Sequence, residues 1–153
     1  RNADVATMTG TNFSSWYNTS EGSIVFDYNI PTSRSFGAVG GIGQNTFNTT
    51  LRFNVVNAAR GTGSSFPNAV VCGTAVLGAN KMAIAMKVND YRSFVNGVSN
   101  GTDTTATMIP ATSDQFNIGW DEATDNTFAN GWMRKIFYYP QRLTDAELAA
   151  FSK

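Results

Sequence analysis

The chain has 153 residues, enough for one domain with its own hydrophobic core, and its 11 basic and 11 acidic side chains leave no formal net charge. Like charges form no block and no apolar run is long, so the sequence predicts neither a nucleic-acid partner nor membrane insertion. The chain contains no histidine, which excludes His-dependent catalytic triads and His-liganded zinc.

Short strand-like runs follow one another along the chain. In residues 22–30, Ile24, Phe26 and Tyr28 alternate with polar or small residues and therefore fall on one face of a strand. Strands are predicted within 22–30, 35–43, 49–57, 68–77, 80–90, 92–101, 114–120 and 131–139. The pair Asn96-Gly97 between apolar residues indicates a tight hairpin. Many short strands at regular spacing favour a sandwich or a barrel.

The chain ends on a pattern of a different kind. Pro140 cannot donate to a sheet ladder, so the strand predicted before it must stop there. Thr144 and Glu147 have the spacing of a helix capping box, and Leu143 is placed to staple onto Leu148. Leu148 and Phe151 share one helical face, so we expect a short helix that packs on the sandwich through both side chains.

Two of these stretches carry a resemblance to a known family. The hairpin "RSFVNGVSNG" (92–101) and the later "FNIGWDE…NGWMRKIFYYPQRLTDAEL" resemble the concanavalin A-like lectin/glucanase superfamily, specifically its laminin-G-like jelly rolls. In that pattern an Asn-Gly turn is followed by an Ile-Gly strand, a variable loop, and a last strand leading into a helical turn. The matching positions are Phe94, Asn96, Gly97, Ile118, Gly119, Gly131, Ile136, Tyr138, Leu143, Thr144, Asp145, Glu147 and Leu148.

The opening of the chain, residues 3–28, is similar to the start of this domain in tailed-bacteriophage structural proteins. The resemblance implies a single all-β domain over residues 1–153, a two-sheet antiparallel jelly-roll sandwich with one short C-terminal helix. It also implies that the domain is part of a larger virion protein, such as a tail fibre or tailspike, and is extracellular on the virion. Its expected partners are a bacterial surface glycan or polysaccharide and other virion proteins, with a homo-oligomer formed through the parent protein.

The carboxylates argue against glycan hydrolysis. Glycosidases need two carboxyl groups that flank the scissile bond, and the hydrolytic relatives place Glu-x-Asp-x-Glu on one strand. This chain has no such run and only three glutamates, Glu21, Glu122 and Glu147. Glu147 belongs to the capping box and Glu21 to a strand entry. We therefore predict that the domain is not an enzyme.

The loop 120–126 carries the densest group of acidic side chains. Asp121, Glu122 and Asp125 offer hard oxygen ligands in a turn, which suits Ca²⁺, and the laminin-G-like relatives often hold calcium at the rim of the sandwich. The spacing is not that of an EF-hand, and the alternative is an acidic loop that is simply solvated.

Sugar sites usually combine an aromatic platform with polar partners. The predicted carbohydrate-binding residues are Trp120, Asp121, Tyr91, Arg92 and Asn126, with Trp120 as the platform. Trp16 is expected to belong to the core, as are Trp132, Phe137 and Tyr139, which lie in a regular strand. Two functions stay open on the sequence: recognition of a bacterial surface glycan, or a structural domain that makes protein contacts within the virion.

Overall fold

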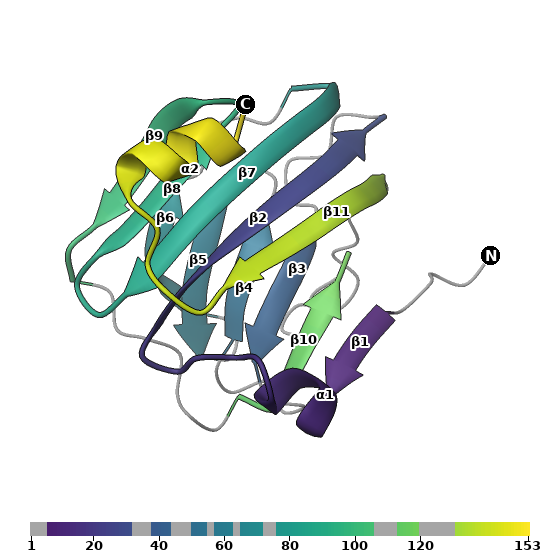
Figure 1. The fold of residues 1–153 in the computed structure, drawn as a ribbon, viewed down its shortest axis with the longest axis vertical. Coiled ribbons are helices and arrows are strands. Elements are labelled where there is room, and N and C mark those ends of the chain that lie inside the picture. The colour runs from purple at the N-terminus through teal and green to yellow at the C-terminus, as the bar shows by residue number, and fades with distance from the viewer. Residues whose placement is uncertain are drawn as a thin grey trace.

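The computed structural model describes residues 6–31, 38–43, 50–54, 57–62, 65–71, 76–105, 113–119 and 131–153. Over these residues the chain forms two antiparallel sheets that face each other, so the predicted all-β sandwich is confirmed (Figure 1). The six-stranded sheet has the order β1 (Ala6–Thr9), β10 (Gln115–Ile118), β3 (Ala38–Gly43), β4 (Thr50–Asn54), β5 (Asn57–Thr62) and β6 (Ser65–Val71). The five-stranded sheet has the order β11 (Trp132–Tyr139), β2 (Glu21–Ile30), β7 (Gly78–Lys87), β8 (Tyr91–Val95) and β9 (Val98–Asp103).

The main core lies between the two sheets. Alternation along β2 and β7 sends every second side chain inward, as the sequence pattern predicts. Phe26 from β2 packs on Phe53 from β4, with ring centroids 5.1 Å apart. The fully buried members of this core include Phe13, Ile24, Phe26, Ile42, Phe53, Met82 and Ile84. The sandwich closes on one side, where the edge strands β6 and β9 approach each other.

The structure differs from the sequence prediction in two places. One short helix is predicted, whereas two are described, because α1 (Thr11–Ser14) forms a single turn after β1. This turn is too short to show a helical period, and its buried Phe13 fixes it to the core. The Gly- and Ser-rich stretch 60–67, which lies between the predicted strands 49–57 and 68–77, holds the end of β5 and the start of β6. Pro67 is tolerated there because β6 is an edge strand.

The helix α2 (Asp145–Phe151) begins as the sequence predicts. The Thr144 hydroxyl accepts a hydrogen bond from the Glu147 backbone N–H, and the Glu147 carboxylate accepts one from the Thr144 N–H at 2.7 Å. Leu148 is fully buried beside Leu143, as expected for the staple. Phe151 differs from the prediction, since it is 42% exposed and lies parallel to Tyr139 with ring centroids 5.4 Å apart. Among the described residues no helix has the length and apolar character needed to cross a bilayer.

Candidate functional site

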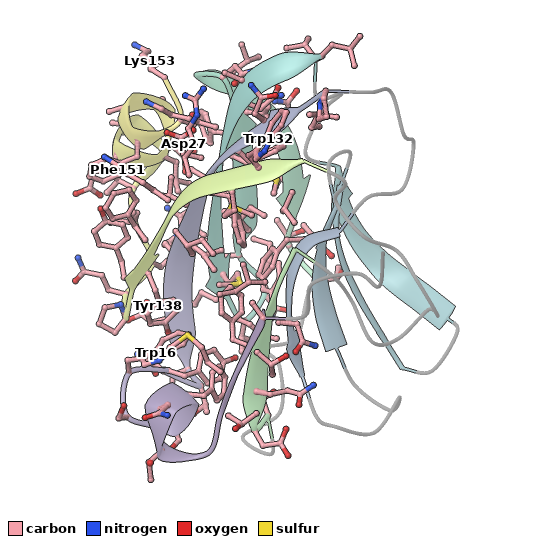
Figure 2. All side chains as sticks on the ribbon, turned by 90° about the vertical axis from the view of Figure 1, so that its right-hand side faces the viewer. Trp16, Asp27, Trp132, Tyr138, Phe151 and Lys153 are labelled. Carbon is pink, nitrogen blue, oxygen red and sulfur yellow. The ribbon has the colours of Figure 1, made fainter. Side chains whose placement is uncertain are left out.

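A groove runs along the outer face of the five-stranded sheet, between α2 and the edge strand β11. It encloses about 360 Å³ and is lined by Val25, Asp27, Lys81, Lys135, Phe137, Tyr139, Ala150 and Phe151. We call it the β11–α2 groove. It exists because α2 packs on β7 and β8 and, among the described residues, leaves the outer face of β11 exposed at Phe137. Figure 2 shows Phe151, the last residue of α2, on this outer side of the sheet.

The floor of the groove is rigid. Val25 is buried at its base and belongs to a second core cluster with Ala83, Phe94 and Leu148. This cluster fills the space between α2 and the outer face of the sheet, so the floor and the helical wall are parts of one packed unit. A floor of this kind holds the side chains above it in fixed positions.

The helical wall is held by polar contacts as well. Ser23 of β2 accepts a hydrogen bond from the Leu143 backbone N–H at 2.8 Å and donates one to the Gln141 carbonyl at 3.0 Å. At the far end of α2, the Ser152 hydroxyl accepts a hydrogen bond from the Gly97 N–H at 3.2 Å. Contacts at both ends of the helix therefore fix its distance from β11, and the width of the groove does not depend on one side chain.

Aromatic rings form the apolar end of the groove. Phe137 of β11 is 46% exposed, opposite Val25 in the register of β11 and β2. Tyr139 and Phe151 lie stacked beside it, joining β11 to α2 across the groove. Two exposed phenylalanines in one hollow are uncommon on a domain surface, where large apolar side chains are scattered singly. This end of the groove can take the apolar face of a ring-shaped ligand.

Charged side chains form the opposite end. Asp27 of β2 is in register with Lys135 of β11 on one side and with Lys81 of β7 on the other. Asp27 also pairs with Arg134 at 3.9 Å, and the Lys81 ammonium donates to the backbone carbonyl of Lys153. The carboxylate can accept hydrogen bonds from hydroxyl groups, and the lysines can donate them. The groove thus combines a stacking surface with hydrogen-bonding groups.

A smaller apolar cleft lies at the open side of the sandwich, between β1, β10 and β11. It encloses about 190 Å³ and is lined by Met8, Trp16, Ile24, Phe116, Ile118, Ile136 and Tyr138. Trp16 donates from its indole nitrogen to the Asn12 carbonyl at 2.6 Å and packs edge-on against Tyr138. Figure 2 shows these two side chains together near α1. As predicted, Trp16 packs against the core, and its one polar atom is already satisfied.

Of the predicted site residues, Tyr91 and Arg92 fall within the described part of the chain. Tyr91 is only 2% exposed and belongs to the main core, so its ring offers no face to a ligand in solvent. Tyr91 is the first residue of β8 and its side chain points inward. The sequence Tyr91-Arg92 alone does not reveal which of the two side chains faces solvent. Arg92 points outward, pairs with Asp90 at 3.4 Å and donates to the hydroxyl of Thr102.

The remaining predicted site residues, Trp120, Asp121, Glu122, Asp125 and Asn126, lie outside the described residues. Among the residues that are described, no group of three or more cysteine or acidic side chains could hold a metal ion. The calcium site at loop 120–126 therefore stays a prediction, as does the stacking role of Trp120.

The groove residues were missed by sequence reasoning. Phe137 and Trp132 were expected in the core, but they are 46% and 64% exposed, so that expectation is wrong. Their strand alternates as a core strand does, and the pattern cannot reveal that β11 is an edge strand whose outer face is uncovered. Tyr139, expected in the core as well, is half-buried against α2. One signal was present in the sequence. The last strand and the helix together carry four aromatic side chains, more than the core beneath two such short elements needs: Trp132, Phe137, Tyr139 and Phe151.

No protein-family model matches the chain, and no curated protein sequence matches it. Solved structures match it in fold. The CBM40 domain of a Ruminococcus gnavus sialidase, bound to α2,3-sialyllactose, has a TM-score of 0.73 at 17% identity, over 99% of this chain and 97% of its own.

Two further matches come from other glycan-active enzymes. Domain 4 of the extracellular arabinanase AbnA from Geobacillus stearothermophilus, in complex with arabinotriose, has a TM-score of 0.73 at 11% identity, over 99% of this chain and 82% of its own. The NanB sialidase of Streptococcus pneumoniae matches at 0.69 and 15% identity over 94% of this chain, which spans 26% of that enzyme. At these identities the likeness establishes the fold, a lectin-like β-sandwich.

Proposed function

We propose that this protein is a non-catalytic carbohydrate-binding domain and that a glycan binds in the β11–α2 groove. The observation that carries the proposal is the exposed pair Phe137 and Phe151 above a rigid floor, with Asp27 and two lysines at the other end. Sugar rings have an apolar face that stacks on aromatic side chains and hydroxyl groups that bond polar ones. Two proteins of the same fold carry saccharides in their structures, sialyllactose and arabinotriose, which supports this class of ligand.

The proposal of a non-catalytic role rests on the carboxylates. Glycosidic hydrolysis by two carboxyl groups needs both to flank one bond. Glu147 is used in the α2 capping box. Glu21 pairs with Lys87 at 3.5 Å and accepts a hydrogen bond from the Arg142 N–H at 3.4 Å. Asp27 is the one carboxylate among the described residues that line the groove, so these residues hold no pair for this chemistry.

The biological setting that we propose is the virion of a bacteriophage. The similarity of residues 3–28 to the start of such domains in phage structural proteins supports a tail fibre, tailspike or other appendage that recognises a surface glycan of the host. In this setting the loop 120–126 is a second contact, in which Trp120 stacks on a sugar and Asp121, Glu122 and Asp125 bind Ca²⁺. The alternative is a structural domain, favoured by Trp132, which is 64% exposed on an edge strand and could meet another virion protein.

The test is a titration of the domain with host surface polysaccharides and an array of bacterial glycans. Phe137→Ala should cost about 1–3 kcal/mol of binding free energy, the scale for burial of a large apolar side chain, with little loss of fold stability. Val98→Ala is the matched control, because Val98 is also exposed but lies on the other edge strand, β9. If Phe137→Ala bound the glycan as tightly as the native domain does, the glycan would not bind in this groove.

Two further measurements separate the parts of the proposal. Trp120→Ala and a calcium chelator should each weaken binding if the loop contributes. If Trp120→Ala weakened binding and the chelator did not, only the calcium part of the proposal would be contradicted. A domain that binds no glycan, and whose Trp132→Ala variant loses association with virion proteins, would establish the structural alternative instead.

A further inference from the structure

The charge at one end of the β11–α2 groove is out of balance with the rest of the chain. Formal charge is zero over the whole sequence. At this end, however, Lys81 and Lys135 flank Asp27 in register and Arg134 pairs with it at 3.9 Å, so three cations accompany one carboxylate among the described residues. Over the described residues the surplus is positive, and it lies in the same groove as the aromatic rings on which a ligand would stack.

The positions of the two lysines follow from the sheet. Lys135 and Lys81 stand on the two strands that flank β2, both in register with Asp27. Neighbouring strands are about 4.8 Å apart, so the two ammonium groups have their stems about 10 Å apart, on either side of the carboxylate. Lysine is a flexible point donor, and both side chains can turn toward one negative group held above Asp27.

A simpler role for these charged side chains is to stabilise the sheet as a ladder of opposite charges, since cross-strand ion pairs contribute up to about 1 kcal/mol. Such a ladder needs only one cation for each carboxylate. Asp27 already pairs with Arg134 at 3.9 Å, and the Lys81 ammonium donates to the Lys153 backbone carbonyl, so among the described residues neither lysine is matched by a carboxylate of its own. Their surplus charge is compensated when a ligand brings its own negative group.

We propose that the groove selects saccharides that carry an anionic substituent, a carboxylate or a sulfate. Lys81 and Lys135 hold the anion, Asp27 accepts a hydrogen bond from a neighbouring hydroxyl, and Phe137 with Phe151 takes the apolar face of the ring. This inference rests on the proposed glycan function and adds the chemical class of the ligand. A volume of about 360 Å³ lies at the low end of small-molecule pockets, which fits a terminal mono- or disaccharide unit.

The experiment uses an array that carries each uronic-acid oligosaccharide beside its methyl ester, and each sulfated oligosaccharide beside its desulfated form. Each pair has the same sugar rings and differs only at the substituent that carries the charge. We expect the charged member to bind roughly tenfold more tightly, the factor that corresponds to one charge-assisted hydrogen bond. Loss on esterification identifies a carboxylate, and loss on desulfation identifies a sulfate.

Variants assign the effect to the groove. Lys81→Gln and Lys135→Gln should each lower affinity for the charged member several-fold and reduce its dependence on salt. The loss for the neutral member should be clearly smaller, because glutamine can still donate a hydrogen bond to a hydroxyl group. Lys87→Gln is the matched control, because Lys87 lies on β7 as Lys81 does but pairs with Glu21 outside the groove. Phe137→Ala should weaken both members of a pair.

Equal binding of charged and neutral members would overturn the inference and leave the glycan function in place. Binding that follows charge but is unchanged in both lysine variants would place the anion elsewhere and overturn it too. Absence of binding to any saccharide would remove the proposed function, and the inference with it. Preferred binding of a single-stranded oligonucleotide, which also combines anions with stacking rings, would replace the saccharide by another class of ligand.

Discussion

At the scale of the single residue, the groove side chains show that exposure and identity must be considered together. Phe137 and Phe151 belong to residue types that are mostly buried, yet both face solvent at the same place. Tyr91, by contrast, has a polar tip and begins a strand, yet it is buried in the main core. The same class of side chain therefore serves the core at one position and a surface at another, and its neighbours decide which.

Gly131 gives a prediction at this scale. A Cβ atom at this position would lie 2.1 Å from the carbonyl oxygen of Asn29, a backbone atom that cannot move without β2. Gly131→Ala should therefore push the start of β11 away from β2 and lower the free energy of unfolding by about 1–3 kcal/mol. Urea unfolding measures this, with Val98→Ala as an exposed control. A loss below about 0.5 kcal/mol would show that β11 is not held at Gly131.

At the scale of the element, α2 is the part whose anchoring can be measured residue by residue. Leu148 is fully buried between the helix and the sheet, so Leu148→Ala should cost about 2–4 kcal/mol of unfolding free energy. Thr144→Ala removes the cap and should cost about 1 kcal/mol. Denaturant unfolding with an unchanged m-value is the check. Negligible losses at both positions would mean that α2 does not contribute to the cooperative unit.

The capping box also predicts a dependence on pH. Hydrogen bonds from the hydroxyl and the backbone N–H of Thr144 lower the pKa of Glu147 from its usual value of 4.5. The unfolded chain therefore binds more protons at this site in acid. The contribution of the charged cap is full above the usual pKa and is lost as pH falls through the lowered one.

Glu147→Gln isolates this effect, because glutamine keeps the acceptor of the capping box but does not titrate. The difference in unfolding free energy between the native chain and this variant should shrink as pH falls from about 6 to about 3. A difference that stays constant over that range would mean that the carboxylate does not bond Thr144 in solution.

The comparison of α2 with β11 explains which features the sequence could predict. The capping box and the staple involve residues three to five positions apart, so Thr144, Glu147 and Leu148 are sufficient to predict them. The exposure of Phe137 depends on which element covers the outer face of β11, and that is decided by residues far away in the chain. Local pattern predicts that β11 is a strand and cannot predict that its outer face stays open.

At the scale of the whole molecule, the same division holds. Alternating strands and the Asn96-Gly97 hairpin are local, and both the two-sheet architecture and this turn are as predicted. The partner of each strand is not local, and the stretch 60–67 shows the result, since pairing between β5 and β6 overrides its turn-like composition. The groove depends on this non-local strand pairing, because it forms only when β11, β2 and β7 lie side by side in the sheet and α2 packs over them.

The position of β2 between β7 and β11 also determines when the domain can be completed. The Asn18 side chain donates to the Pro140 carbonyl at 2.8 Å, and Ser23 accepts from the Leu143 N–H at 2.8 Å. Residues early in the chain therefore gain these contacts only after residues 140–143 are in place. Closing so long a loop costs entropy before any contact forms, which favours slow folding. On the ribosome, one edge of β2 stays unpaired until β11 emerges, and during that time the nascent chain is open to wrong strand pairing.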